Sequence, residues 1–280
     1  MIRYPFIFLI CLVLNVCISS FARGAEKVSA FLRVKDEIKT IEACLNSIDG
    51  VFDRIVIIHS NEKDDGSVAF MQQWCAQRSE CEIHEYPFAV IPSHDRQYVQ
   101  KQVSYENTLA AYNNFGLQLF EPEEWVVKID ADQVYLKKNM INFVQKVRQS
   151  ENDNEIYLME GYNSLPWHGK LVLLKEYPII GKYRDHFAIK RKNLKDFKQC
   201  KFWECYVLKN RLSRIYVPAT EMLWFHFKKE VKKGILKIPN DDLREEQVLF
   251  FNKAEERLFD NEIRPLLKNS PYYHLKFNNE

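Results

Sequence analysis

The stretch Trp125–Tyr135, read WVVKIDADQVY, constrains the fold of this chain more than any other feature. Its first five residues are apolar apart from Lys128, which predicts a buried strand. The strand ends in two carboxylates, Asp130 and Asp132. The carboxyl ends of parallel strands border the crevice in which ligands bind, and paired carboxylates there suit a hard divalent cation. Because turns also favour Asp for its backbone hydrogen bonds, the pair indicates a site only if its surroundings agree.

Three further strand patterns precede this stretch, and helical patterns separate them. The predicted strands are Val28–Val34, Arg54–His59 and Glu82–Tyr86. The first predicted helix places four apolar side chains on one face, Ile38, Ile41, Leu45 and Ile48. Strands that alternate with helices predict an α/β fold with a mostly parallel central sheet flanked by helices.

The second half of the chain has a less regular pattern. Short strand patterns occur at Ile156–Met159, Leu171–Leu174 and Met222–Phe227. The segment 241–267 is expected to be helical. We therefore expect one domain over residues 25–280, with a regular half at 25–143 and a less regular half at 144–280.

The charge of the chain is nearly balanced. Its 40 Lys and Arg residues face 38 Asp and Glu, and hydrophobic residues make up 46% of the sequence, which is enough for a sizeable core. Nucleic-acid-binding chains usually carry a strong basic excess, so no nucleic-acid partner is expected. Local basic runs at 190–192 and 228–233 are either solvated faces or contacts for anionic lipid head groups or a phosphorylated acceptor.

The seven cysteines are scattered and form no zinc-binding pattern. Cys44 and Cys75 fall in predicted helices and are expected to behave as small buried hydrophobes. The spacing also allows the disulfides Cys75–Cys81 and Cys200–Cys205 in an oxidising compartment, but reduced thiols are expected.

Residues 1–24 form an apolar N-terminal segment. Arg3 precedes an almost wholly apolar run from Tyr4 to Ile18, and small residues follow, an order typical of a signal peptide. The run is slightly shorter than the roughly 20 residues of a comfortable membrane span, so an anchor and a start-site extension are alternatives. Because Arg23 and Lys27 outnumber Arg3, we expect association with the inner membrane on its cytoplasmic face, with export as the alternative.

Polar residues follow three of the predicted strands. Glu37 follows the first strand, and Asn61 and Asp65 follow the second. Asp130 and Asp132 follow the strand Trp125–Ile129. Parallel strands end at one edge of their sheet, so these side chains are expected to share a crevice. Neither a Gly-x-Gly-x-x-Gly pattern nor a P-loop motif occurs, which disfavours a dinucleotide-binding domain and a P-loop enzyme.

Three segments carry a more specific signal when taken together, namely Ala30–Glu37 (AFLRVKDE), Asp65–Ser67 (DGS) and Trp125–Asp132 (WVVKIDAD). They resemble family-2 GT-A glycosyltransferases, and most of all the bacterial β-1,4-N-acetylgalactosaminyltransferases of lipooligosaccharide synthesis. The resemblance covers about residues 30–143. It implies a Rossmann-like GT-A sheet and a less regular, acceptor-binding second half. It also implies metal-dependent, inverting transfer of a sugar, N-acetylgalactosamine, from a UDP-sugar to a glycan or glycolipid acceptor such as lipooligosaccharide.

The resemblance implies roles for the residues at the strand ends. Asp132 and Asp130 would hold Mn²⁺ or Mg²⁺, which acts as a Lewis acid when a diphosphate departs. The implied contacts of the nucleotide sugar are Arg33, Glu37, Asn61, Glu62, Asp65, Lys128 and Asp130. Because Asp65 directly precedes a predicted helix, capping of that helix is its simpler role.

An inverting transferase also needs a base for the proton of the acceptor hydroxyl. In the resembled family this carboxylate follows the metal motif, and Asp185 is the first candidate, with Glu160 in reserve. Asp185 is equally well explained as a loop residue paired with Arg184 or Lys182.

Three aromatic or imidazole side chains complete the candidates. His226 lies in an apolar run, where it is either a third metal ligand, as in many relatives, or a core histidine. Trp167 and His168 lie at a predicted turn. They form either a platform on which an acceptor sugar stacks or an ordinary turn.

Two other functions fit part of the pattern. A secreted or membrane-attached domain that binds carbohydrate or calcium without catalysis has no need of polar residues at three strand ends. Another nucleotide-sugar enzyme, such as a nucleotidyltransferase, would carry a glycine-rich loop after its first strand, where residues 32–37 contain no glycine. The sequence favours the transferase.

Overall fold

The computed structural model describes most of the chain after residue 25. The described residues are 26–60, 62, 64–92, 95, 97, 100, 102–181, 186–200, 204–216, 221–228, 230–233 and 236–277. The apolar segment 1–24 and the candidates Asn61 and Asp185 lie outside them. In the ranges described, no helix is both long and apolar enough to cross a membrane.

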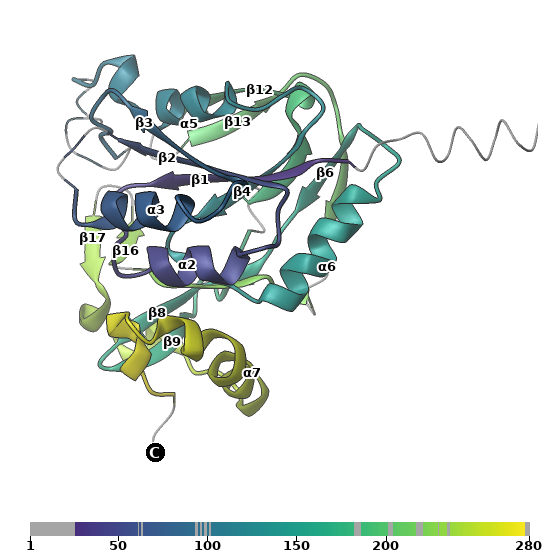
Figure 1. Ribbon diagram of the computed structural model, residues 1–280. Coiled ribbons are helices and arrows are strands. Elements are labelled where there is room, and N and C mark those ends of the chain that lie inside the picture. Colours follow the sequence, from purple (N-terminus) through teal and green to yellow (C-terminus); the bar gives the residue numbers. More distant parts are fainter. Residues whose placement is uncertain are drawn as a thin grey trace, which may run out of the picture.

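A seven-stranded sheet forms the centre of the fold, in the order β14-β6-β11-β4-β1-β2-β3 (Figure 1). Its strands are β1 Val28–Val34, β2 Arg54–Ser60, β3 Cys81–Tyr86, β4 Trp125–Asp130, β6 Glu155–Leu158, β11 Phe187–Lys190 and β14 Ser213–Tyr216. Neighbouring strands pair in parallel, except that β11 is antiparallel to both β4 and β6. This arrangement confirms the predicted α/β class, with its mostly parallel central sheet flanked by helices.

Helices cover one face of this sheet, and a helix with a hairpin covers the other (Figure 1). The first face carries α2 Ile41–Ile48, α3 Ser67–Cys75 and α6 Lys137–Arg148. The second face carries η1 Tyr105–Asn107, α5 Leu109–Leu117, β12 Leu194–Gln199 and β13 Glu204–Leu208. The centre of the sheet is therefore buried on both sides, which is why β1, β2 and β4 are mostly apolar runs in the sequence, whereas the edge strands β3 and β14 are not.

Alternate residues of each central strand enter different cores. In β4, Trp125, Val127 and Ile129 belong to the core beneath α2, α3 and α6. Val126, between them, belongs to the core beneath α5 and the β12–β13 hairpin. This period of two follows from the pleat of a strand, and it leaves the end of β4 as the place where polar side chains collect.

Smaller sheets form the rest of the second half. One has the order β10-β7-β15-β5, another the order β18-β9-β8, and β16 pairs with β17. Their strands are β5 Gln133–Tyr135, β7 Gly161–Tyr162, β8 Ser164–Trp167, β9 Lys170–Leu174, β10 Ile179–Ile180, β15 Trp224–His226, β16 Glu230–Lys233, β17 Leu236–Pro239 and β18 Val248–Leu249. The short helical elements are η2 Arg191–Asn193, η4 Asn240–Asp242, η5 Glu245–Gln247, α7 Lys253–Leu258, η6 Phe259–Ile263, η7 Arg264–Leu267 and η8 Pro271–His274.

Several local expectations are corrected by the structure. Ile38 is 43% exposed, because the backbone amides of Thr40 and Ile41 both donate to the Glu37 carbonyl and the helix begins only at Ile41. The segment 241–267 is not a continuous helix but a series of short helical turns interrupted by β18. Local periodicity alone does not report such breaks.

Four of the cysteines are joined in the structure. Disulfides link Cys75 with Cys81 and Cys200 with Cys205, so the expectation of reduced thiols does not hold for these residues. Cys44 is a buried free thiol, as expected. The first disulfide ties α3 to β3, and the second links Cys200, which follows β12, to Cys205 of β13.

Candidate active site

The carboxyl end of β4 places Asp130 among cationic side chains. Lys128 is buried, and its Nζ lies 2.8 Å from Asp130 Oδ1. Parallel pairing sets Arg33 of β1 beside Asp130, and Arg33 Nη2 lies 3.6 Å from the same oxygen. His186, just ahead of β11, brings its Nδ1 to 3.6 Å from Asp130 Oδ2.

These neighbours keep Asp130 ionised. Burial would raise the pKa of Asp130, but the charges of Lys128, His186 and Arg33, together with the Lys128 hydrogen bond, hold it below its ordinary value. Both oxygens of the Asp130 carboxylate thus face cationic side chains of the protein. Asp130 consequently carries a fixed negative charge that orients the cations around it.

A polar network holds the turn after β4 in place. The Tyr135 hydroxyl lies 2.5 Å from Gln133 Oε1 and accepts a hydrogen bond from the Asp130 amide at 3.3 Å. The Gln133 amide group approaches His186 Nε2 at 3.1 Å. Ser47 Oγ, on the neighbouring helix α2, accepts a hydrogen bond from the Tyr135 amide at 3.0 Å. Buried groups satisfied in this way fix the direction in which the next carboxylate points.

Asp132 meets His226 through the pairing of two three-residue strands. β5 and β15 are antiparallel, with His226 opposite Gln133, and the Phe227 amide donates to the Asp132 carbonyl at 2.8 Å. His226 Nε2 then lies 2.7 Å from Asp132 Oδ2, although the two residues are 94 positions apart in the chain. His226 is buried, and its imidazole faces the Asp132 carboxylate, an arrangement that suits either a metal ligand or a hydrogen-bonded core histidine.

The charge of Asp132 is balanced differently from that of Asp130. Burial would raise the pKa of Asp132, and the charge and hydrogen bond of His226 lower it below its ordinary value. The negative charge of Asp130 also raises the pKa of Asp132, and the positive charge of Lys228 lowers it. Asp132 is thus the carboxylate with fewer cations of its own.

Asp132 and His226 have the donor chemistry of a divalent metal site. A carboxylate oxygen and an imidazole nitrogen suit Mn²⁺ and other divalent ions. No group of three or more His, Cys, Asp or Glu side chains that could hold a metal is found in the described part of the chain. Asp132 and His226 are therefore the residues whose chemistry fits a divalent metal here. Asp130, which was also expected to hold the metal, pairs with Lys128 and Arg33 in the structure.

A pocket lies at the carboxyl ends of β1 and β2. It is lined by Val34, Lys35, Asp36, His59, Ser60, Glu62, Asp64, Ser67, Val68 and Met71. At its side, Lys35 forms an ion pair with Glu62, and Ser60 Oγ donates to Glu62 at 3.2 Å. The Tyr112 hydroxyl joins the two strand ends beneath it, 2.5 Å from the Ile58 carbonyl and 3.1 Å from the Val34 carbonyl.

Two of the expected nucleotide contacts have local partners. Asp65 accepts hydrogen bonds from the amides of Ser67 and Ile38, both at 3.0 Å, so it joins the loops after β1 and β2 at the start of α3. This is close to the capping role that was the simpler expectation. Glu37 receives a hydrogen bond from Thr40 at 3.4 Å, and its amide donates to Ser67 Oγ at 3.1 Å.

Glu204 is a site residue that the sequence analysis missed. It lies on β13, and its Oε1 is 2.5 Å from Arg33 Nη1, so Arg33 is held between Glu204 and Asp130. Burial would raise the pKa of Glu204, but the charges of Arg33 and Lys128 lower it below its ordinary value. The signal in the sequence was a single carboxylate inside the otherwise apolar run Phe202–Leu208, next to Cys205.

The remaining candidates lie in the second half. Glu160 follows β6, is half-buried, and accepts a backbone hydrogen bond from Leu223 at 2.9 Å, just before β15. Trp167 ends β8, with its indole N–H donating to the Leu243 carbonyl at 2.9 Å. His168 has a φ of 46° and is exposed, as expected of a turn residue.

Comparison with known families bears on the first half of the chain. Residues 22–152, just under half of the chain, match a family model described as Beta-1,4-N-acetylgalactosaminyltransferase (CgtA). This match confirms the resemblance to that family of glycosyltransferases. The matched segment includes Arg33, Asp130 and Asp132, and it ends before Glu204 and His226. No curated protein matches the chain.

Two solved structures illustrate the more distant likenesses. S. aureus TarS 1–349 in complex with UDP is 15% identical, with 49% of this chain and 36% of that chain covered and a TM-score of 0.35. The second is a Bacillus anthracis protein, provisionally identified as a glucose-1-phosphate thymidylyltransferase, in complex with a sucrose. It is 9% identical, with 60% of this chain and 72% of that chain covered and a TM-score of 0.36. This chain thus spans about a third of the TarS chain, and TM-scores this low carry no conclusion about function.

Proposed function

We propose that this protein is a metal-dependent glycosyltransferase that moves a sugar from a UDP-sugar to a glycan or glycolipid acceptor. The observation that supports it most is the meeting of Asp132 and His226, 2.7 Å apart, at the end of the strand that the family model covers. A non-catalytic binding domain would not require a buried imidazole to face the second carboxylate of this turn. N-acetylgalactosamine is the proposed sugar, on the basis of the family description.

In this proposal the two halves of the molecule hold different parts of the donor. The pocket at the ends of β1 and β2 would receive the nucleoside, with Glu62 at its side. Lys128 and Arg33, fixed by Asp130 and Glu204, would supply positive charge beside the diphosphate. Asp132 and His226 would hold Mn²⁺ or Mg²⁺, which when bound supplies Lewis-acid stabilisation of the leaving diphosphate.

The chain must also supply a base. The acceptor oxygen forms a bond to the anomeric carbon as the bond from that carbon to the diphosphate breaks, and UDP leaves with the electron pair. The hydroxyl proton passes to a carboxylate, for which Asp185 is the first candidate and Glu160 the reserve. An attack from the face opposite the diphosphate would invert the anomeric centre.

Titration calorimetry of UDP-N-acetylgalactosamine into the full-length protein tests this function. We expect binding in the presence of Mn²⁺ and its loss when EDTA is added, because the diphosphate completes the metal's ligands. Binding that is equal in EDTA would contradict the metal role of Asp132 and His226. If this donor and other UDP-sugars all fail to bind, the transferase proposal is wrong, and pyrophosphate release from a nucleoside triphosphate and a sugar 1-phosphate becomes the assay to run.

We also propose that residues 1–24 attach the enzyme to the cytoplasmic face of the inner membrane, where nucleotide sugars are available. The support is the order of its apolar run and the positive charges after it. Export through this segment is the alternative, and the disulfides Cys75–Cys81 and Cys200–Cys205 favour it. Removing residues 1–24 should leave a soluble and active enzyme, measured by sedimentation after cell lysis and by donor turnover. An inactive, unfolded product would mean that the segment belongs to the domain.

A further inference from the structure

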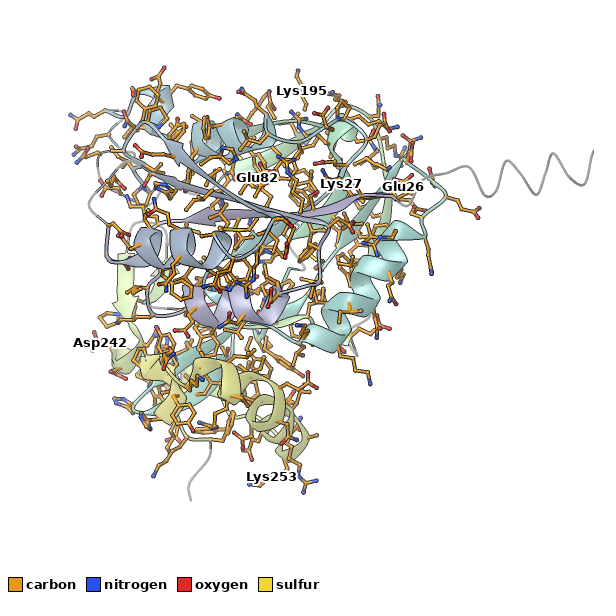
Figure 2. All side chains as sticks on the ribbon, in the orientation of Figure 1. Glu26, Lys27, Glu82, Lys195, Asp242 and Lys253 are labelled. Atoms are coloured by element: carbon orange, nitrogen blue, oxygen red, sulfur yellow. A yellow bond between two sulfur atoms is a disulfide. The ribbon has the colours of Figure 1, made fainter. Side chains whose placement is uncertain are left out.

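A second cavity, of about 340 Å³, lies between the loop after β1 and the C-terminal part of the chain. It is lined by Lys39, Pro166, Trp167, Gly169, Pro239, Asn240, Asp241 and Tyr272. Its size falls within the roughly 300–1,000 Å³ of small-molecule sites. In Figure 2, Asp242, the neighbour of Asp241, lies at the left edge of the C-terminal part, and Lys253 lies at its lower end.

Hydrogen bonds hold the walls of this cavity together. Ser270 Oγ donates to the Lys39 carbonyl at 2.6 Å, which ties the start of η8 to the loop after β1. Trp167 is fixed by its bond to Leu243, and the amide of His168 donates to Asp241 at 2.6 Å. Hydrogen bonds therefore connect the segments that surround the cavity.

One lining residue of the cavity, Tyr272, is linked to the proposed metal pair through Phe227. Tyr272 stacks on Phe227, with ring centroids 5.1 Å apart and planes 19° from parallel, and Phe227 is the residue whose amide bonds to Asp132. Burial, and then the negative charges of Glu37 and Asp132, raise the pKa of Tyr272 to about 12. Tyr272 therefore keeps its hydroxyl proton at neutral pH, within the electrostatic reach of the candidate active site.

The chemistry of the lining suits one ring of a saccharide. Trp167, with the largely buried Tyr272 ring also in the lining, offers aromatic surface to the apolar C–H face of a pyranose. Asp241, Lys39 and the Tyr272 hydroxyl offer partners for its hydroxyl groups. Asp241 is largely exposed and Tyr272 is buried, so polar groups lie both at the mouth and on the floor.

We propose that this cavity binds a pyranose ring of the acceptor saccharide, with Trp167 and Tyr272 as its aromatic contacts and Lys39 and Asp241 as its polar ones. The assignment rests on the proposed transferase function and adds to it the place of the acceptor. The C-terminal residues after 240 thereby become part of the acceptor site.

Saturation-transfer NMR on the full-length protein tests the assignment, with methyl β-pyranosides of galactose, glucose and N-acetylglucosamine as probes. We expect transfer to the ring protons of at least one probe in the presence of UDP and Mn²⁺. Tyr272→Phe keeps the stacked ring and removes only the hydroxyl, and Lys39→Ala changes an exposed side chain, so both variants should fold. Each should weaken probe binding about tenfold, the effect of a lost hydrogen bond of about 1.4 kcal/mol.

Two matched variants serve as controls. Tyr273→Phe alters the neighbouring tyrosine, and Lys268→Ala alters another C-terminal lysine, and neither residue lines the cavity. Both should bind the probe as the wild type does. Absence of transfer to every probe, or equal transfer in Tyr272→Phe, Lys39→Ala and their controls, would overturn the assignment. UDP titration of the same samples separates this failure from failure of the donor site.

Discussion

The two halves of the molecule build their shares of the candidate site in different ways. The first half places Arg33, Glu62 and Asp130 at the ends of neighbouring strands of one sheet, so their closeness follows from strand order. The second half contributes isolated side chains, His226 from a three-residue strand and Glu204 from a hairpin. The first arrangement depends on a buried sheet, whereas the second depends on single long-range contacts.

This difference separates the two carboxylates of β4. Asp130 is enclosed by Lys128, Arg33 and His186, two of which come from the first half. Asp132 relies on His226, from the second half. The cations around Asp130 and the partner of Asp132 thus come mainly from different parts of the chain.

The largest effect is expected from Asp132→Asn. Loss of the anionic ligand should lower the turnover of UDP-N-acetylgalactosamine by at least about 10³-fold, or about 4 kcal/mol of transition-state stabilisation. The measurement is turnover at saturating Mn²⁺, with circular dichroism to show that the fold is retained. Asp260→Asn, an exposed aspartate paired with Arg264, is the control and should be unaffected. Near wild-type turnover of Asp132→Asn would remove Asp132 from the metal site.

Asp185→Asn sharpens the assignment of the base. Loss of a general base should cut turnover by about 10²-fold while donor affinity is kept, because the base acts on the acceptor hydroxyl and not on the donor. Steady-state kinetics together with calorimetry of donor binding make the distinction. Glu160→Gln is the paired variant, and if it carries the loss in place of Asp185→Asn, the roles of the two residues are exchanged. A change in melting temperature alone would leave Asp185 a structural residue.

His226→Ala tests whether the second half completes the metal site. Removal of the imidazole should raise the Mn²⁺ concentration for half-maximal activity by about 10–100-fold, the usual range for a weakened metal shell. Activity is titrated against Mn²⁺, with His274→Ala, an exposed histidine of η8, as the control. An unchanged titration would return His226 to the role of a core residue.

The smallest effect concerns the regular half alone. Glu82 lies on the α5 side of the sheet (Figure 2), and its bidentate pair with Arg54 has bond lengths of 2.6 and 2.8 Å. Hydrogen bonding by Arg54 lowers the pKa of Glu82 to about 2. The pair therefore stabilises the fold above the ordinary pKa of 4.5, and this contribution is lost as the pH falls towards 2.

Glu82→Gln should accordingly lower the free energy of unfolding at pH 7 by no more than about 1 kcal/mol, since the carboxylate is substantially exposed. Urea unfolding at pH 7 and near pH 2.5 provides the measurement, and the difference from the wild type should shrink at the lower pH. Glu85→Gln on the same strand is the control. A difference that grows in acid would show that Glu82 is not stabilised as an anion.

The sequence predicted the regular half well because its strands are buried on both faces. The bounds of β1 agree with the prediction, and β2 and β4 each extend one residue further. The position of the site at the ends of these strands also follows from the α/β pattern. What the sequence could not show were side-chain pairs between distant segments, such as Arg33 with Glu204, 171 positions apart. The hydrophobic periodicity of a short segment cannot predict such a pair, because the pair depends on how separate elements pack against one another.

The second half was harder to predict for a related reason. Its strands are two to six residues long, too short for a period of two to stand out. Tyr272 was missed because nothing in its neighbourhood distinguishes an aromatic residue of the core from one that lines a cavity. Residues 1–24, Asn61 and Asp185 stay predictions.

The pairing of β5 with β15 also has a consequence for the order in which the protein matures. A ribosome must make the chain through His226 before Asp132 can meet its partner, whereas the strands that support Arg33 and Asp130 are complete by residue 130. Contacts between distant segments form late because a long loop must first close. A nascent chain should therefore complete the strands that carry Arg33 and Asp130 before it becomes able to hold a metal, and catalytic competence should follow only once His226 has been made.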